Sequence, residues 1–150
     1  MKRFKKAIAL LLTLATVFSL TVSAGAFFGS PIGAGSKDDV DIGVPAVIRG
    51  EIYLYTDTTS TGLPWLEISA VTTVDSRYTM AEVCARMECQ YNSTGELVRP
   101  TATDSAYARN TNTVEAFCGF SKPVPGRVAV HSTHEATYSR SDYLYMITLI

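Results

Sequence analysis

Two histidines and a glutamate in the segment VHSTHEATYS come closest to a metal-binding or catalytic set. His131 and His134 are three positions apart, and Glu135 directly follows the second. On a continuous strand an odd separation points the two imidazoles to opposite faces, so a shared metal would require a bend between them. The H-E-x-x-H spacing of zinc peptidases is absent. The default interpretation is two ordinary surface or turn histidines; if a metal did bind, its predicted ligands are His131, His134 and Glu135.

A serine or cysteine nucleophile requires a base within hydrogen-bond reach and a third group that orients the base. The sequence has no G-x-S-x-G motif, and Ser132 beside His131 is adjacency without the geometry of a triad. We therefore predict no catalytic residues and no cofactor. A small secreted hydrolase that uses His131 or His134 is kept as the third of three functional hypotheses.

The three cysteines permit only certain pairings. On a strand that rises about 3.3 Å per residue, Cys84 and Cys89 lie roughly 16 Å apart, more than twice the Cα separation of a disulfide. On a helix their side chains would point about 140° apart. Cys89 and Cys118 both fall on the apolar faces of their segments, so we predict a Cys89–Cys118 disulfide. Cys84 remains on the polar face as an unpaired surface thiol or, alternatively, as half of an intermolecular bridge.

Aromatic residues offer a further candidate site. Tyr53 and Tyr55 share one face of a predicted strand, and Trp65 begins the next strand. Solvent-facing rings with hydroxyl groups make good recognition surfaces, because they supply contact area at little entropic cost. The alternative is that these rings pack under a loop or cover cross-strand neighbours. If the face is exposed, we expect it to contact a glycan or another protein.

A period of two places these residues on strands. From Val44 apolar residues alternate with polar ones, and turn signals separate short segments as far as the closing run DYLYMITLI. Residues 80–91 have both a capping-box spacing and a clean alternation, and the strands on both sides favour a strand. The closing run is apolar on both faces, which predicts a central position in a sheet. We expect an all-β domain, an antiparallel sandwich or small barrel of seven or eight short strands.

The amino-terminal part has the layout of a signal peptide. A basic cluster precedes a long uncharged run that ends in small residues, which predicts export and cleavage after Ala26. An uncleaved membrane anchor is the alternative, although the many Thr, Ser and Gly make the run a poor one. We expect a signal peptide over residues 1–26, a flexible lead over 27–43, and an all-β domain over 44–150, with no membrane span after cleavage.

The net charge of the chain limits the kinds of partner that we expect. The chain has 13 Lys and Arg and 14 Asp and Glu, and four of the basic residues precede position 27, which leaves 9 − 14 = −5 for the mature chain. A net negative surface repels phosphates, so we expect no nucleic acid partner. The leading hypothesis is a secreted bacterial protein that acts as a non-catalytic binding module for an extracellular protein or glycan. The second is a secreted antimicrobial or toxin-like effector. The sequence leaves the oligomeric state open.

Overall fold

The computed structural model describes residues 30–58, 62, 64–91, 102–121 and 128–150. In these ranges the regular structure is all β, because alternating apolar and polar side chains favour a pleated chain with one buried face. The strands are β1 (Gly33–Lys37), β2 (Val47–Thr58), β3 (Pro64–Asp75), β4 (Met80–Tyr91), β5 (Ala102–Thr111), β6 (Thr113–Ser121), β7 (Val128–Thr137) and β8 (Ser141–Leu149).

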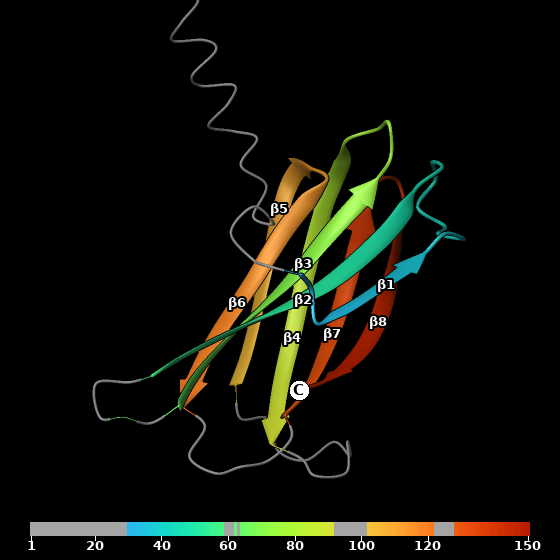
Figure 1. Ribbon diagram of the computed structural model, residues 1–150. Helices are drawn as coiled ribbons and strands as arrows, with labels where there is room; N and C mark the ends of the chain where they lie inside the picture. The colour runs from blue at the N-terminus through green and yellow to red at the C-terminus, as the bar shows by residue number, and fades with distance from the viewer. Residues whose placement is uncertain (1–29, 59–61, 63, 92–101, 122–127) are drawn as a thin grey trace, which may run out of the picture.

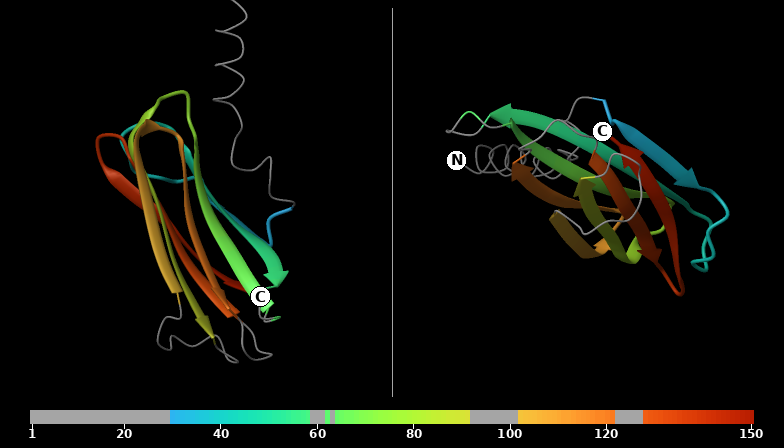
Figure 2. Two further views of the ribbon diagram at one scale, coloured as in Figure 1. Left: turned by 90° about the vertical axis from the view of Figure 1, so that its left-hand side faces the viewer. Right: turned by 90° about the horizontal axis from the view of Figure 1, so that it is seen from below.

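The strands form two antiparallel four-stranded sheets that are stacked as a sandwich (Figure 1, Figure 2). Sheet A has the order β1-β2-β3-β6, and sheet B has the order β5-β4-β7-β8. β1 and β8 lie along one side of the sandwich, and β5 and β6 lie along the other. The predicted all-β antiparallel fold is therefore confirmed, as a sandwich and not as a closed barrel.

Two apolar clusters fill the space between the sheets, and a layer of polar residues lies between them. The layer consists of Gly50, Thr72, Ser132 and His134, each of which stands on its strand between members of the two clusters. A Cβ atom at Gly50 would collide with the imidazole of His134, so glycine here makes room for a buried ring. The larger cluster comprises Ile52, Leu66, Ile68, Ala70, Ala85, Met87, Cys89, Ala116, Cys118, Phe120, Val128 and Val130, and the smaller one Ile42, Ile48, Val74, Met80, Val83 and Ala136.

Residues 80–91, whose sequence carried both helix and strand signals, form a strand, as predicted. β4 lies in the middle of sheet B and pairs with β5 and β7, so both of its edges are hydrogen-bonded. Its residues Val83, Ala85, Met87 and Cys89 are buried between the sheets. Alternation was the stronger signal because it describes a strand with one face in the core.

Part of the predicted flexible lead is ordered, so that prediction is wrong for residues 33–37. This segment forms β1, which pairs antiparallel with β2. A Cβ at Gly33 would collide with Thr148, and one at Gly35 would press on Met146, so the small residues let β1 approach sheet B. Glycines give no hydrophobic periodicity, which is why the strand was not visible in the sequence. The predicted signal peptide and its cleavage site lie outside the described residues.

The closing strand occupies a different place from the one predicted. β8 lies at an edge of sheet B, although its apolar residues on both faces indicated a central position. Its inward side chains cover the core, but Tyr143, Tyr145, Ile147 and Leu149 point outward and are each about half exposed. The apolar residues on the outer face of β8 therefore do not mean that another layer of this chain covers that face.

Each cysteine lies on the face of its strand that the alternation of side chains predicted. Cys89 on β4 and Cys118 on β6 point into the core from opposite sheets, and their Sγ atoms are 3.5 Å apart as free thiols. The predicted disulfide is thus not formed in this structure. Cys84 is on the outer face of sheet B but is only 6 % exposed, so the expectation of a surface thiol is wrong. Neighbouring side chains on a sheet can bury a small residue on a nominally polar face.

Candidate functional site

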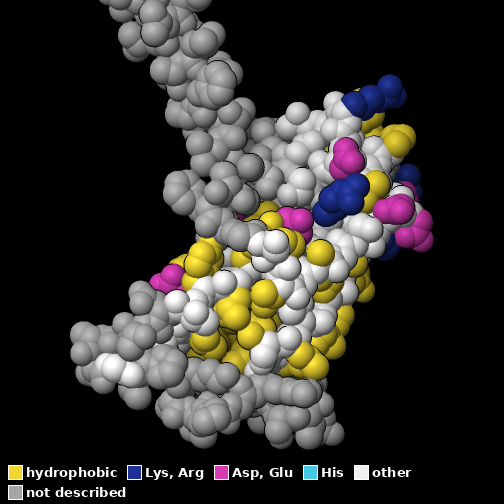
Figure 3. Space-filling view, in the orientation of Figure 1, with side chains coloured by type: hydrophobic (Ala, Val, Ile, Leu, Met, Phe, Trp, Pro, Cys, Tyr) yellow, Lys and Arg dark blue, Asp and Glu magenta, His cyan; other side chains and the backbone are white. Residues whose placement is uncertain are grey.

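The three aromatic residues predicted as a recognition surface lie on the outer face of sheet A, but they are only partly accessible. Tyr53 is 6 % exposed, while Tyr55 and Trp65 are half-buried. Burial and a hydrogen bond to Glu51 raise the pKa of Tyr53 to about 12, so its hydroxyl stays protonated and donates to the carboxylate at 2.8 Å. In Figure 3, which has this sheet in front, the charged side chains lie mainly at the upper right. Because its side chain is buried and its hydroxyl is bonded to Glu51, Tyr53 is a packed residue and not part of an exposed row.

Trp65 lies across β6 in a position that depends on a glycine. Its indole Nε1 donates to Glu67 at 3.1 Å, and a Cβ at Gly119 would be 2.7 Å from Cζ2 of the ring. Gly119 pairs directly with Glu67 across the strands. The absence of a side chain at position 119 thus leaves room for the indole beside β6.

Replacement of this glycine should move the only tryptophan of the chain. Gly119→Ala should displace the indole, break its bond to Glu67 and destabilise the fold by about 1–2 kcal/mol, as is usual for overpacking. The measurement is the tryptophan emission maximum, which we expect to shift to longer wavelength. Gly35→Ala is the control, because the new methyl group would meet the flexible Met146 side chain instead. Unchanged emission in Gly119→Ala would contradict the described ring position.

The histidine segment is split between the two faces of β7. His134 points into the core and is fully buried, whereas His131 and Glu135 lie on the outer face. β7 is one uninterrupted strand from Val128 to Thr137, so side chains an odd number of residues apart stay on opposite faces and the three residues do not form a shared site. Among the described residues no group of three or more potential ligands could hold a metal ion.

His134 takes part in a serine–histidine–threonine arrangement that is sealed in the core. Its Nε2 is 3.0 Å from Oγ of Ser132, and its Nδ1 is 2.8 Å from Oγ1 of Thr72. Thr72 also donates to the carbonyl of Cys84 at 2.9 Å. All three side chains are at most 1 % exposed, so a substrate has no access to the serine. This network satisfies buried polar groups and orders the interior.

The outer face of sheet B carries a surface hollow. It has a volume of about 320 Å³ and is lined by Arg86, Met87, Glu88, His131, Thr133 and Tyr145. The strand register explains the set, because Arg86, Thr133 and Tyr145 form one cross-strand row. Glu88 and His131 stand opposite each other in the next row. A second hollow of about 320 Å³ lies on the other side of β4 and is also lined by Arg86 and Glu88.

One wall of the first hollow is a histidine–tyrosine pair. Nδ1 of His131 is 2.6 Å from the hydroxyl of Tyr145, and the ring centroids are 6.2 Å apart. Nε2 of His131 is buried without a hydrogen-bond partner, so this imidazole has unused bonding capacity beside the hollow. Buried polar atoms are normally paired, and exceptions are often found at functional sites.

The opposite wall carries two residues of opposite charge. Cys84 and Glu135 lie near Arg86 and raise its pKa, so the guanidinium is always charged. Its contact with Glu135 is long, at 3.9 Å, and the side chain is mostly exposed. An exposed pair of this kind is weak, so Arg86 can exchange Glu135 for a ligand at little cost. Glu88 is an exposed acceptor two residues further along the strand.

Sequence reasoning identified only His131 of this set. Arg86 and Glu88 alternate on the polar face of β4, and Tyr143 and Tyr145 alternate on β8, which is the available signal. These strands are far apart in the sequence, and only the pairing of β7 between β4 and β8 brings them together. Register between non-consecutive strands is not readable from a single sequence.

The described residues contain no helix long and apolar enough to cross a bilayer. No protein-family model matches the chain, and no curated protein or solved structure matches it significantly.

Proposed function

We propose that the chain is exported and acts as a non-catalytic binding module, with a neutral glycan held on the outer face of sheet B. Export is supported by the basic, apolar and small-residue regions at the amino terminus. The binding role is supported by the hollow between β4 and β8. It combines a few polar groups with aromatic surface, which is the usual composition of a ligand site.

The chemistry of the hollow suits a ligand with many hydroxyl groups. Arg86 supplies donors and Glu88 supplies acceptors, while Thr133 and Tyr145 can do both. Tyr107 and Tyr143 are 71 % and 59 % exposed on the same face and offer flat rings against which a sugar can pack. The opposite charges of Arg86 and Glu88 on β4 neutralise each other, so we do not expect the site to prefer a strongly anionic ligand.

A non-catalytic role fits the placement of the nucleophile candidates. Ser132 is in the core, where it bonds to His134, and His131 contacts a phenol instead of a serine. A hydrolase would need a reactive atom, a base and an orienting group at one accessible point. The hollow among the described residues brings together donors and acceptors without that arrangement.

The glycan proposal is tested by replacing the charged wall. Arg86→Ala should weaken binding by about tenfold or more, because a charged hydrogen bond contributes roughly 1.5–3 kcal/mol. The measurement is isothermal titration with a panel of soluble neutral polysaccharides, such as β-glucan, xylan and mannan. Arg49→Ala is the matched control, since Arg49 is an exposed arginine on sheet A that contacts Asp75 at 3.5 Å.

Two results would count against this function. One is the absence of binding to every polysaccharide in the panel. The other is equal loss of affinity in Arg86→Ala and Arg49→Ala, because the binding surface would then not be the hollow on sheet B.

A further inference from the structure

We propose that two copies of the chain dimerise by antiparallel pairing of their β8 strands, so that two B sheets join into one continuous sheet. Four of the large hydrophobic residues exposed in the described part of the chain lie on the outer face of this single edge strand. Tyr143, Tyr145, Ile147 and Leu149 are 59 %, 48 %, 53 % and 52 % exposed. These four residues are called the β8 stripe below.

The backbone groups that such pairing needs belong to the same residues. Val128 and Ile150 exchange both of their hydrogen bonds, at 2.9 Å each. In an antiparallel pair, exchanging and non-exchanging positions alternate. The inward residues of β8 therefore bond to β7, and the N–H and C=O groups of the β8 stripe point away from the sheet. An edge of this kind is a template for another strand.

The other edge strands carry features that discourage pairing along their length, whereas on β8 the charge is confined to Asp142 near its beginning. β1 has only five residues. On β6 the N–H of Phe117 is bonded to the carboxylate of Asp104 at 2.8 Å, which occupies a ladder donor. β5 presents Arg109, which is bonded to Glu82 at 3.2 Å. Short strands and charged side chains are common protections of sheet edges.

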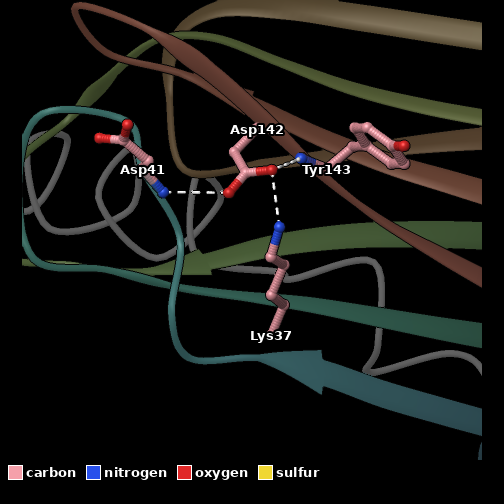
Figure 4. Close-up of polar contacts among 4 residues, drawn as sticks. All are labelled: Lys37, Asp41, Asp142 and Tyr143. Carbon is pink, nitrogen blue, oxygen red and sulfur yellow. Dashed lines mark hydrogen bonds and ion pairs between the residues drawn. The ribbon is translucent and has the colours of Figure 1, made fainter.

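Charge favours a second copy as the occupant. The only charged residue of β8 is Asp142, and Lys37 from β1 contacts its carboxylate at 2.7 Å (Figure 4). The N–H of Asp41 donates to the same carboxylate at 3.0 Å. The pKa of Asp142 is lowered, mainly by the hydrogen bond from Lys37, so the ion pair persists over the neutral range. The edge is thus neutral overall, and two copies meet without like-charge repulsion.

Symmetry defines the register. A two-fold axis through the middle of β8 places Tyr145 opposite the same residue of the second copy and Tyr143 opposite Ile147. This register pairs every residue of the strand, and it sets Asp142 against Thr148 instead of a second aspartate. Aromatic and β-branched cross-strand pairs are favourable, and a two-fold interface is self-complementary.

The area that the pairing can bury indicates a dissociable dimer. The β8 stripe stays on the outer face of the joined sheet, and each of its side chains is covered only on the flank that meets its cross-strand neighbour, so the stripe buries only part of its exposed area. The backbone edge adds to this, and a standard interface buries about 800 Å² per partner. The dimer would place two hollows on one face, which would increase avidity for a repetitive polymer. The pairing itself does not depend on that function.

The test is the oligomeric state of the purified full chain. Sedimentation velocity at about 100 µM should give a dimer for the wild type and for Ile32→Lys, which changes an exposed isoleucine beside β1. Tyr145→Lys should be monomeric with an unchanged far-ultraviolet spectrum, because the two-fold axis would set the two lysines directly opposite each other. A monomeric wild type, a dimeric Tyr145→Lys, or a series of higher oligomers would overturn the proposal.

A cross-link tests the register without relying on loss of assembly. Paired residues that exchange hydrogen bonds have Cα atoms about 5.5 Å apart, within the range of a disulfide. Tyr145→Cys should therefore form a covalent dimer under mild oxidation. Phe117→Cys is the matched control on the edge strand β6, where the side chain is 46 % exposed, and it should remain monomeric on a non-reducing gel. Cross-linking of Phe117→Cys but not of Tyr145→Cys would place the interface elsewhere.

Discussion

Oxidation of the chain should join Cys89 to Cys118 and raise the free energy of unfolding by about 3.5 kcal/mol. The two thiols meet in the core with their Sγ atoms 3.5 Å apart, so little movement is needed. They are 29 positions apart, and closing a loop of about 30 residues stabilises a fold by that amount on the chain-entropy estimate. The measurement is urea unfolding of the oxidised and the reduced protein, with the mass of the oxidised form lower by two thiol hydrogens.

Single cysteine variants identify the pair. Cys118→Ala should abolish the mass change, whereas Cys84→Ala should retain it, because Cys84 lies on the outer face of sheet B. A hydrogen bond to Cys118 and burial raise the pKa of Cys89, so Cys89 is the protonated member of the pair. A peptide linking Cys84 to Cys118 in non-reduced material would contradict the assignment.

Acidification from pH 7 to pH 4 should destabilise the fold by about 3 kcal/mol through His134 alone. Burial lowers the pKa of this imidazole from 6.5 to about 4, because a charged ring would be poorly solvated between the sheets. Between these values the unfolded chain binds a proton and the folded chain does not. The stabilisation is therefore complete above pH 6.5 and is lost as the pH falls towards 4.

A neutral replacement isolates this contribution from that of the carboxylates. His134→Gln keeps an amide near Thr72 and Ser132 but has no proton to gain. Its free energy of unfolding, measured by urea titration at several pH values, should fall by about 3 kcal/mol less than that of the wild type over the same interval. Parallel pH profiles for the two proteins would show that His134 is not the titrating group.

Much of the fold was predictable from local alternation. β2, β3, β4, β6 and β7 each have one strongly apolar face, and parity alone placed Cys89 and Cys118 towards each other. β1 was missed because Gly33 and Gly35 pack through their small size and not through hydrophobicity. β8 was misplaced because the prediction assumed that apolar residues on both faces require two covering layers within one chain.

The candidate site was less predictable, since it depends on which strands are neighbours. The alternation gave the face of Tyr53 and Tyr55 on their strand, but the accessibility of the aromatic residues depends on Glu51, Glu67 and Gly119, which lie on three strands. Arg86 and Tyr145 come together only because β7 lies between β4 and β8. Parity gives the face of each side chain, while long-range pairing decides which faces meet.

The strand order also has a consequence for how the chain folds. β3 pairs with β6 and β4 pairs with β7, so each sheet is completed by a strand that follows part of the other sheet in the sequence. Such interlocked pairings bring together distant segments, and proteins with high contact order fold in milliseconds to seconds. A nascent chain ending at Thr111 would contain the β2–β3 and β4–β5 pairs but neither completed sheet, so cooperative folding should wait until β6 and β7 have been synthesised.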